Sequence, residues 1–301
     1  MHEIFCFFMR FDFLKYRKIY FIFSGILILG SLVCLGVFGL KPGIDFTGGS
    51  ILEVEYKAER FSNQEIKNAL ADLELGEIYI QPTGERGVII RMKDIDEATH
   101  QQVLEKLEGV EELRFESIGP VIGRELKEKT KIVIVLSLLA IVFYIALAFR
   151  RIQRPVSSWQ YGIASLLALF HDVLIPIGTL SLLGKFYGVQ ITIPVIVALL
   201  TVLGYSINNT VVVFDRIREN LLKRIGATYE GTVNNSLNQT LTRSLNTSLT
   251  TLFVLIAIFL LGGETLKYFA LTLILGIAAG TYSSIFLASP ILVSWLKWRK
   301  K

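Results

Sequence analysis

Residues 19–40 read IYFIFSGILILGSLVCLGVFGL, an uninterrupted apolar run that decides the fold class of this chain. The run is 22 residues long, and about 20 apolar residues allow a helix to cross the hydrocarbon core of a bilayer. A cleaved signal peptide is the alternative, but this run is longer than the apolar region of such peptides, and Lys41-Pro42-Gly43 lacks their small-residue cleavage pattern. The sequence therefore predicts a transmembrane helix.

Five more apolar runs follow along the chain. The 301 residues are 52% hydrophobic and only 19% charged, whereas soluble domains carry about 25% charged residues. Apolar residues concentrated in runs are typical of membrane spans rather than of a large soluble core. We therefore predict an α-helical polytopic membrane protein with six transmembrane helices, the other five near 132–149, 159–183, 191–213, 244–261 and 266–296.

Lysine and arginine are concentrated in alternate connections between these runs, which predicts the orientation. One side of the membrane receives Arg10, Lys15, Arg17, Lys18, Arg150, Arg151, Arg154, Arg216, Arg218, Lys223, Arg224, Lys297, Arg299, Lys300 and Lys301, whereas the opposite short loops hold little more than Lys185 and Lys267. Cytoplasmic loops carry the basic excess, so both termini are predicted to be cytoplasmic. The predicted divisions are a cytoplasmic segment 1–18, a first span 19–40, an outside domain 41–129, spans two to six within 130–296, and a cytoplasmic tail 297–301.

The outside segment has the pattern of a small α+β domain. Ser62-x-x-Glu65 is a capping box that begins a helix, and residues 82–87 have the composition of a hairpin turn. Alternating and helical periodicities predict strands at 50–56, 77–81, 88–92 and 112–117, with helices from Ser62 and over 95–108. The order βαββαβ is the ferredoxin-like arrangement.

Charge, cysteine content and motifs exclude several functional classes. Residues 41–129 carry 19 acidic and 12 basic side chains, and the basic residues elsewhere are spread over short loops, so we expect no nucleic-acid partner. Cys6 lies in the N-terminal tail and Cys34 within the first apolar run, which favours neither a disulfide nor a metal site. The sequence has no phosphate-binding loop, zinc-protease pair or serine-hydrolase elbow. We therefore expect no cofactor, no metal and no enzymatic activity.

Polar residues interrupt the fourth span near its predicted cytoplasmic end. Thr201, Tyr205, Asn208 and Asn209 follow at steps of four, three and one, and we expect them to share a face. Such residues must pair within protein or face water. Asp215 and Arg216 lie nearly two turns further, where they are either solvated flanking charges or functional groups.

The fifth span carries a polar stripe at helical spacing. Arg243, Asn246, Thr247, Thr250 and Thr251 recur at i, i+3, i+4, i+7 and i+8. An apolar face of Leu245, Leu249, Leu252 and Phe253 lies beside it. Two alternatives remain for Arg243, which either extends to the lipid headgroups or has a role in ion coupling.

His171 and Asp172 stand near the middle of the third span. A carboxylate at that depth is costly to insert and usually marks an ion or proton pathway, although a hydrogen bond that only ties helices together is the alternative. Adjacent helical residues point about 100° apart, so we expect each to meet a different neighbour. Gly276-x-x-x-Gly280 in the last span indicates close helix packing.

Several motifs occur together in a familiar order: GIDFTGG at 43–49, SIGPVIG at 117–123 and VLGYSINNTVVVFDRIREN at 202–220. The segment FDFLKYR at 11–17, the pair His171-Asp172, and TLTRSLNTS at 240–248 agree with the same pattern. Over nearly its whole length the chain resembles the SecF family, the smaller membrane subunits of the bacterial SecD–SecF complex. The family's motif residues correspond here to Asp45, Gly48, Gly49, Gly119, Pro120, Gly204, Asp215 and Arg216.

The resemblance implies a fold, partners and a location. The six spans would form one half of a bundle of the RND superfamily and pair with SecD, and the complex would use the proton motive force to draw unfolded preproteins from the SecYEG channel, which works with SecA. YajC is a further candidate partner, and membrane lipid surrounds the spans. The implied location is the bacterial inner membrane, and the implied role is non-enzymatic.

One position departs from the family pattern. The family usually has an aspartate where this chain has Asn209, opposite the arginine of the fifth span, and an amide exchanges no proton at physiological pH. Three alternatives stay open: coupling passes through a SecD carboxylate and Asp172 with Arg243 as charge partner, the ion is sodium, or this half is structural. At the level of function, an RND-like small-molecule exporter and a passive membrane scaffold are the competing hypotheses.

Overall fold

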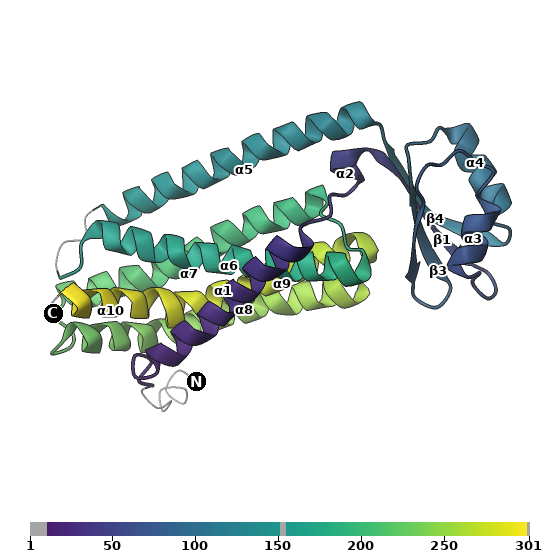
Figure 1. Ribbon diagram of the computed structural model, residues 1–301. Helices are drawn as coiled ribbons and strands as arrows, with labels where there is room; N and C mark the ends of the chain where they lie inside the picture. The colour runs from purple at the N-terminus through teal and green to yellow at the C-terminus, as the bar shows by residue number, and fades with distance from the viewer. Residues whose placement is uncertain (1–10, 151–154, 300–301) are drawn as a thin grey trace. The chain divides into compact units, whose positions relative to one another are not determined.

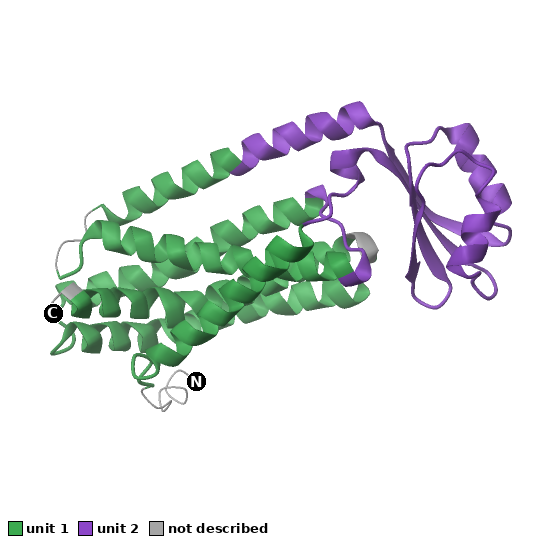
Figure 2. Ribbon diagram, in the orientation of Figure 1, with its two compact units in different colours: residues 1–39, 135–185, 194–301 green, residues 40–134, 186–193 purple. Residues whose placement is uncertain are grey.

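The structure is a computed structural model that describes residues 11–150 and 155–299. The chain forms two compact units (Figure 2): a helical unit within 1–39, 135–185 and 194–301, and a sheet unit of residues 40–134 and 186–193. The sheet unit thus includes a connection between two predicted spans, which no sequence pattern predicted. Predictions for Cys6, Arg10, Arg151, Arg154, Lys300 and Lys301 lie outside the described residues.

The sheet unit has the predicted ferredoxin-like fold. Its strands β1 (Gly49–Tyr56), β2 (Tyr79–Thr83), β3 (Gly87–Met92) and β4 (Val110–Ile118) form one antiparallel sheet in the order β2-β3-β1-β4. Helices α3 (Asn63–Ala69) and α4 (Glu97–Lys106) lie on one face of the sheet, and the short helix α2 (Ile44–Thr47) precedes β1 (Figure 1). The capping box at Ser62 and Glu65 forms as predicted.

Alternation along the strands builds the core of this unit. Leu52 and Val54 of β1 are fully buried with Ile66 of α3 and Val103 of α4. Pro82, expected in the hairpin turn, lies within β2 instead. Because β2 is an edge strand, a residue without a backbone N–H is tolerated there.

A helix cap makes part of the sheet unit depend on pH. Asp96 Oδ1 accepts hydrogen bonds from Thr99 Oγ1 at 2.6 Å and from Thr99 N at 2.9 Å, and these bonds lower the pKa of Asp96 below its usual 3.8. A lowered pKa in the folded state means that the cap stabilises α4 above the usual pKa and is lost as pH falls through the folded value. We expect Asp96→Ala to speed amide exchange in the first turn of α4 at pH 7, and the difference from the unmodified chain to vanish well below pH 3.8. Hydrogen-exchange mass spectrometry checks this, with Glu85→Ala in the β2–β3 turn as the control that should change nothing in α4.

Six helices of the described residues are long and apolar enough to span a membrane, as predicted. They are α1 (Arg17–Phe38), α5 (Pro120–Phe149), α6 (Ser158–Tyr187), α7 (Ile193–Leu222), α8 (Tyr229–Leu261) and a last span made of α9 (Glu264–Ser283), the π-helix η2 (Ser284–Ala288) and α10 (Ser289–Arg299). Several of these helices are longer than the apolar runs and continue into polar sequence at the span ends, as α5 and α7 do.

Small residues bring the spans of the helical unit together. A Cβ at Gly276 would lie 2.9 Å from Cβ of Val202, and one at Gly280 would lie 3.3 Å from Cα of Ser206, so α9 and α7 pack closely at both glycines. A Cβ at Gly178 would lie 2.5 Å from Cα of Ser31, which places α6 against α1. This geometry agrees with the packing role predicted for Gly276 and Gly280.

Candidate functional site

A buried carboxylate joins three spans of the helical unit. Asp172 lies near the middle of α6 with 0% exposure. Its Oδ1 accepts a hydrogen bond from His171 Nδ1 at 2.8 Å, and its Oδ2 accepts from Ser206 Oγ of α7 at 2.5 Å and from Ser283 Oγ of α9 at 2.7 Å. As expected, the two side chains meet different neighbours, since the His171 ring stacks on that of Tyr282 with centroids 6.0 Å apart, but the imidazole also turns back onto the adjacent carboxylate.

Four buried polar atoms of the helical unit lack hydrogen-bond partners among the described residues. They are His171 Nε2, Asn209 Nδ2, Thr210 Oγ1 and Ser165 Oγ. His171 and Ser165 belong to α6, and Asn209 and Thr210 lie one turn from Ser206 on α7. Orphaned polar atoms in a native structure are typical of sites that take up water or an ion. The Asp172 cluster, which includes Ser283 of α9, and these unpartnered atoms of α6 and α7 all lie in the buried interior of the helical unit.

The two asparagines of α7 separate. Asn209 is only 4% exposed, whereas Asn208, Thr201 and Gly204 lie on the exposed side of the helix and Tyr205 is half-buried. The prediction that Asn208 and Asn209 share a face is wrong, since successive helical residues differ by about 100° in direction. Asn209, which stands where the family usually has an aspartate, is thus buried inside the helical unit.

The polar stripe of α8 lies on its exposed side. Arg243, Asn246, Thr247 and Thr250 are exposed, and the Thr247 and Thr250 hydroxyls donate to the carbonyl oxygens of Arg243 and Asn246. In the part of the chain that the structure describes, the Arg243 guanidinium forms no ion pair, and Asp172 takes its donors from His171, Ser206 and Ser283. The structure does not bring Arg243 and Asp172 together.

The apolar neighbours of the stripe are not a buried face. Leu245, Leu249 and Phe253 are exposed, and the buried side of α8 carries small polar residues such as Ser244 and Ser248. Ser248 Oγ is hydrogen-bonded to Thr281 Oγ1 and accepts from Tyr205 Oη.

The first family motif ties a connection between spans to the sheet unit. Asp45 Oδ2 accepts a hydrogen bond from Ile193 N, the first amide of α7, at 2.8 Å. Gly43 N donates to Ile191 O at 2.8 Å, and Ile191 N donates to Lys41 O at 2.7 Å. A carboxylate at a helix N-terminus satisfies an orphan amide and complements the helix dipole. Asp45 therefore fixes where α7 begins.

Glycines of two motifs pack against each other in the sheet unit. Gly48 has φ +74°, and a Cβ there would lie 2.8 Å from Cα of Pro120, the first residue of α5. A Cβ at Gly123 would lie 2.8 Å from Gly48 N, and one at Gly49, with φ +132°, would lie 2.8 Å from Met92 O. Gly119 has no such neighbour within 4 Å. Gly48 and Gly123 thus permit the close approach of the β1 entrance to α5, and Gly49 permits its close approach to β3.

The charged end of the α7 motif forms local ion pairs. Arg218 Nη1 lies 3.4 Å from Asp215 Oδ1, and Arg216 Nη1 lies 2.8 Å from Glu219 Oε2. The Asp215 side chain is 68% exposed. These contacts agree with solvated flanking charges, which are one of the two alternatives for Asp215 and Arg216.

Sequence reasoning missed the partners of Asp172. Ser206 precedes Asn209 by three residues, so its spacing within the α7 motif was the available signal. Ser283 carries no comparable signal, because serines are frequent in the last span and no short-range pattern marks one of them.

Comparison with known proteins supports the resemblance. The family model "Protein export membrane protein SecD/SecF, C-terminal" matches residues 99–298, and "SecD/SecF GG Motif" matches residues 35–59. The chain is 42% identical to a protein translocase subunit SecF of Thermobaculum terrenum, with 94% of this chain and 93% of the relative covered. It is 37% identical to that of Anaerolinea thermophila, with 94% of each covered.

Solved structures are similar over the same length. A SecDF from Thermus thermophilus, described as a translocon-associated membrane protein, matches with a TM-score of 0.82 at 34% identity, covering 96% of this chain. A SecDF in a super-membrane-facing form matches with a TM-score of 0.67 at 35% identity, covering 97%. This chain spans 39% of the length of either SecDF chain.

Proposed function

This chain belongs to the SecF family of protein translocase subunits, and on that premise we propose that it is a non-enzymatic accessory subunit of the Sec translocase that works with SecD. The solved SecDF chains support SecD as the partner, since they continue well beyond the length that this chain matches. The complex would couple an ion gradient to late-stage export of polypeptides. The observation that carries the coupling is the buried carboxylate of Asp172, held by three spans.

The exposed polar faces of α7 and α8 support a partner within the membrane. Asn208 on α7 and Arg243, Asn246 and Thr247 on α8 are exposed on spans that would otherwise meet lipid. Polar groups at membrane depth face protein or water. We assign this face to SecD, with a SecD carboxylate as the charge partner of Arg243.

Ion coupling follows from the hydrogen bonds of Asp172. As a carboxylate it accepts from three donors. A proton on Asp172 would turn one acceptor position into a donor. A proton on Oδ1 directed at His171 Nδ1 would require that hydrogen bond to reverse or break. We assign protonation of Asp172, with His171 as its adjacent proton partner, as the step that shifts α7 and α9 relative to α6.

Helix α7 offers a direct route from this step to the sheet unit. Ser206 of α7 donates to Asp172, and the first amide of the same helix is held by Asp45. A shift of α7 along its axis therefore acts on the segment that leads through Gly48 and Gly49 into β1. The sheet unit would bind unfolded preproteins on the far side of the bacterial inner membrane, both termini being cytoplasmic, and SecYEG, SecA and YajC would be the further partners.

Translocation into inverted vesicles tests the proposal. Vesicles that carry SecYEG, SecA and the cognate SecD are compared with and without this chain, while a proton-specific or sodium-specific ionophore is added. We expect this chain to raise late-stage translocation and the gain to vanish when the proton gradient collapses. If only the sodium ionophore abolishes the gain, sodium and not the proton is the coupling ion. If neither ionophore changes the gain, the passive scaffold is favoured.

Two variants separate the coupled subunit from its alternatives. Arg243→Leu should abolish the gain if the polar face of α8 meets a charged partner, whereas a scaffold tolerates an apolar residue there. An RND-like small-molecule exporter predicts that efflux of small molecules, and not preprotein translocation, responds to this change.

Asn209→Asp would restore the family's carboxylate at a buried position. Asn209 is 4% exposed and its Nδ2 has no partner among the described residues, so the new carboxyl group would enter a site close to the Asp172 cluster. We expect the ion dependence of translocation to shift to a different pH range, measured as translocation rate against pH. An unchanged pH profile and ion flux would show that position 209 takes no part in coupling.

A further inference from the structure

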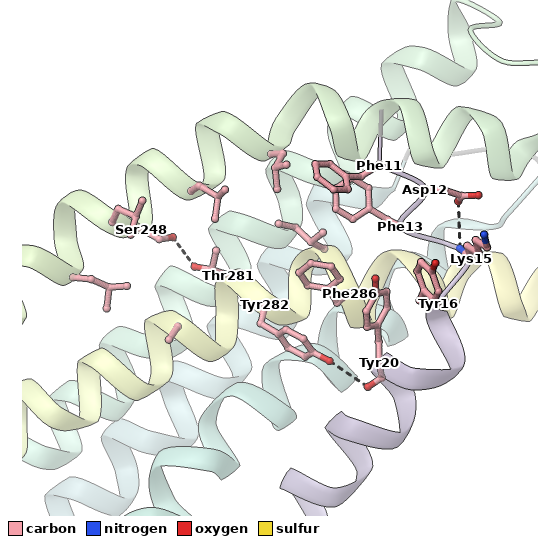
Figure 3. Close-up of a pocket in the computed structure, with 16 residues that line it drawn as sticks. Phe11, Asp12, Phe13, Lys15, Tyr16, Tyr20, Ser248, Thr281, Tyr282 and Phe286 are labelled. Carbon is pink, nitrogen blue, oxygen red and sulfur yellow. Dashed lines mark hydrogen bonds between the residues drawn. The ribbon is translucent and has the colours of Figure 1, made fainter. Parts of the chain in front are cut away.

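A groove of about 1020 Å³ lies in the helical unit between the chain before α1, α8 and α9 (Figure 3). Leu241, Leu245, Leu249 and Leu252 of α8 form one wall. Ala278 and Thr281 of α9 and Ile285 of η2 also line it, and its volume is at the upper end of small-ligand pockets, about 300–1,000 Å³.

Aromatic rings form the opposite wall. The ring of Phe286 lies 4.7 Å from that of Tyr20, 5.2 Å from Tyr282 and 5.8 Å from Phe13. Tyr282 Oη also donates to Tyr20 O at 3.2 Å, which holds the start of α1 against the last span. Only Ser24 and Ser31 of α1 are buried, so α1 contacts its neighbours at a few points and leaves the apolar groove beside it open.

The groove continues into a basic pocket at the end of the spans. This second cavity, of about 480 Å³, shares Asp12, Lys15 and Tyr16 with the groove and adds Arg17, Lys18, Glu230 and Lys297. Glu230 Oε1 already accepts from Arg17 Nη1 at 2.7 Å and from Lys297 Nζ at 2.6 Å.

Two cations of this pocket remain available to a ligand. Within residues 11–150 and 155–299, neither the Lys15 nor the Lys18 ammonium pairs with a carboxylate, and Lys15 Nζ lies 5.5 Å from the centre of the Tyr16 ring. An apolar groove beside unpaired cations at one end of the spans complements a molecule with a long apolar tail and an anionic head.

We propose that this groove binds an anionic phospholipid, with an acyl chain between the α8 leucines and the aromatic wall and the phosphate at Lys15 and Lys18. Basic pockets between transmembrane helices recognise anionic headgroups in this way, and each cation near the surface contributes about 1 kcal/mol. The lipid would fill the space beside α1 and fix its start against η2.

The groove and the polar stripe of α8 are separate surfaces. At 100° per residue, the mean direction of the four groove leucines lies roughly 150° from that of Arg243, Asn246, Thr247 and Thr250. A partner on the stripe therefore leaves the groove accessible to lipid, and the lipid site is independent of the proposed translocase role.

Native mass spectrometry of the full chain purified with SecD tests the site. Phosphatidylglycerol and phosphatidylcholine with identical acyl chains are added to delipidated complex, and bound lipid is counted. We expect one phosphatidylglycerol to be retained at concentrations where phosphatidylcholine is not. Lys15→Gln/Lys18→Gln should weaken phosphatidylglycerol binding about tenfold or more, as expected for two interfacial charges, whereas Lys223→Gln/Arg224→Gln at the end of α7 should not.

A matched pair of tryptophan variants on α8 tests the groove itself. Leu249→Trp fills the groove and should reduce retained phosphatidylglycerol at least tenfold, whereas Leu260→Trp, on a side chain that is 70% exposed outside the groove, should leave it unchanged. Equal effects of both variants, or equal retention of both lipids, would reduce the site to ordinary lipid contact and overturn the proposal. Binding that appears only after residues 2–10 are removed would overturn it as well, because the chain's own N-terminus would then be the occupant.

Discussion

Asp172→Ala should abolish the stimulation of translocation and lower the stability of the helical unit. The change leaves His171 Nδ1 and the hydroxyls of Ser206 and Ser283 without their buried acceptor. Each buried donor left without a partner costs about 1–3 kcal/mol. Thermal unfolding in detergent and the vesicle assay with SecD measure the two effects.

Asp172→Asn separates coupling from stability. The amide keeps the shape of the side chain and one oxygen acceptor but exchanges no proton, so we expect the protein to fold and bind SecD while its ion-dependent gain in translocation is lost. Asp72→Asn is the control, since that carboxylate is 81% exposed and pairs only with Lys106 of α4 in the described structure. An Asp172→Asn variant with a full ion-dependent gain would remove the buried cluster from the mechanism and leave it a tie between helices.

Gly48→Ala should disrupt the junction between β1 and α5. The added Cβ would lie 2.8 Å from Cα of Pro120, and φ +74° is unfavourable for alanine. Backbone strain and overpacking together cost about 2–5 kcal/mol. We expect faster amide exchange along β1, a lower unfolding temperature and loss of the translocation gain.

Gly84→Ala is the matched control for this steric argument. Gly84 also has positive φ, +59°, but no heavy atom lies within 4 Å of its hypothetical Cβ. Only the backbone cost remains, about 1 kcal/mol, and the translocation gain should persist. Equal losses for the two variants would mean that conformation alone, and not the contact with Pro120, explains the glycine at position 48.

Local patterns predicted the architecture well because they act over a few residues. The apolar runs determine six spans, and the Ser62–Glu65 capping box and strand alternation determine the sheet unit without knowledge of its neighbours. Strand ends moved by one or two residues, since hydrogen-bonded pairing and not side-chain pattern decides where a strand stops.

The candidate site was harder to predict because its contacts are distant in sequence. Asp172 was identified from its depth in a span, but Ser206 and Ser283 are 34 and 111 residues away, and only Ser206 lies in a motif that could have marked it. Asn208 and Asn209 point about 100° apart on the helix, and the sequence did not show which of the two is buried. Leu245, Leu249 and Leu252 of the predicted apolar face of α8 line the groove, whereas Phe253 is exposed outside it.

The bond between Asp45 and Ile193 sets an order on biosynthesis. All four strands have been synthesised once Ile118 is made, and they leave the ribosome while the second span is being made, so the sheet can close before most of the spans exist. Ile193 follows Asp45 by 148 residues, which at about 5–20 residues per second is a delay on the order of ten seconds. The hydrogen bonds of the connection 186–193 to Lys41, Gly43 and Asp45 can therefore form only after all four strands have been made.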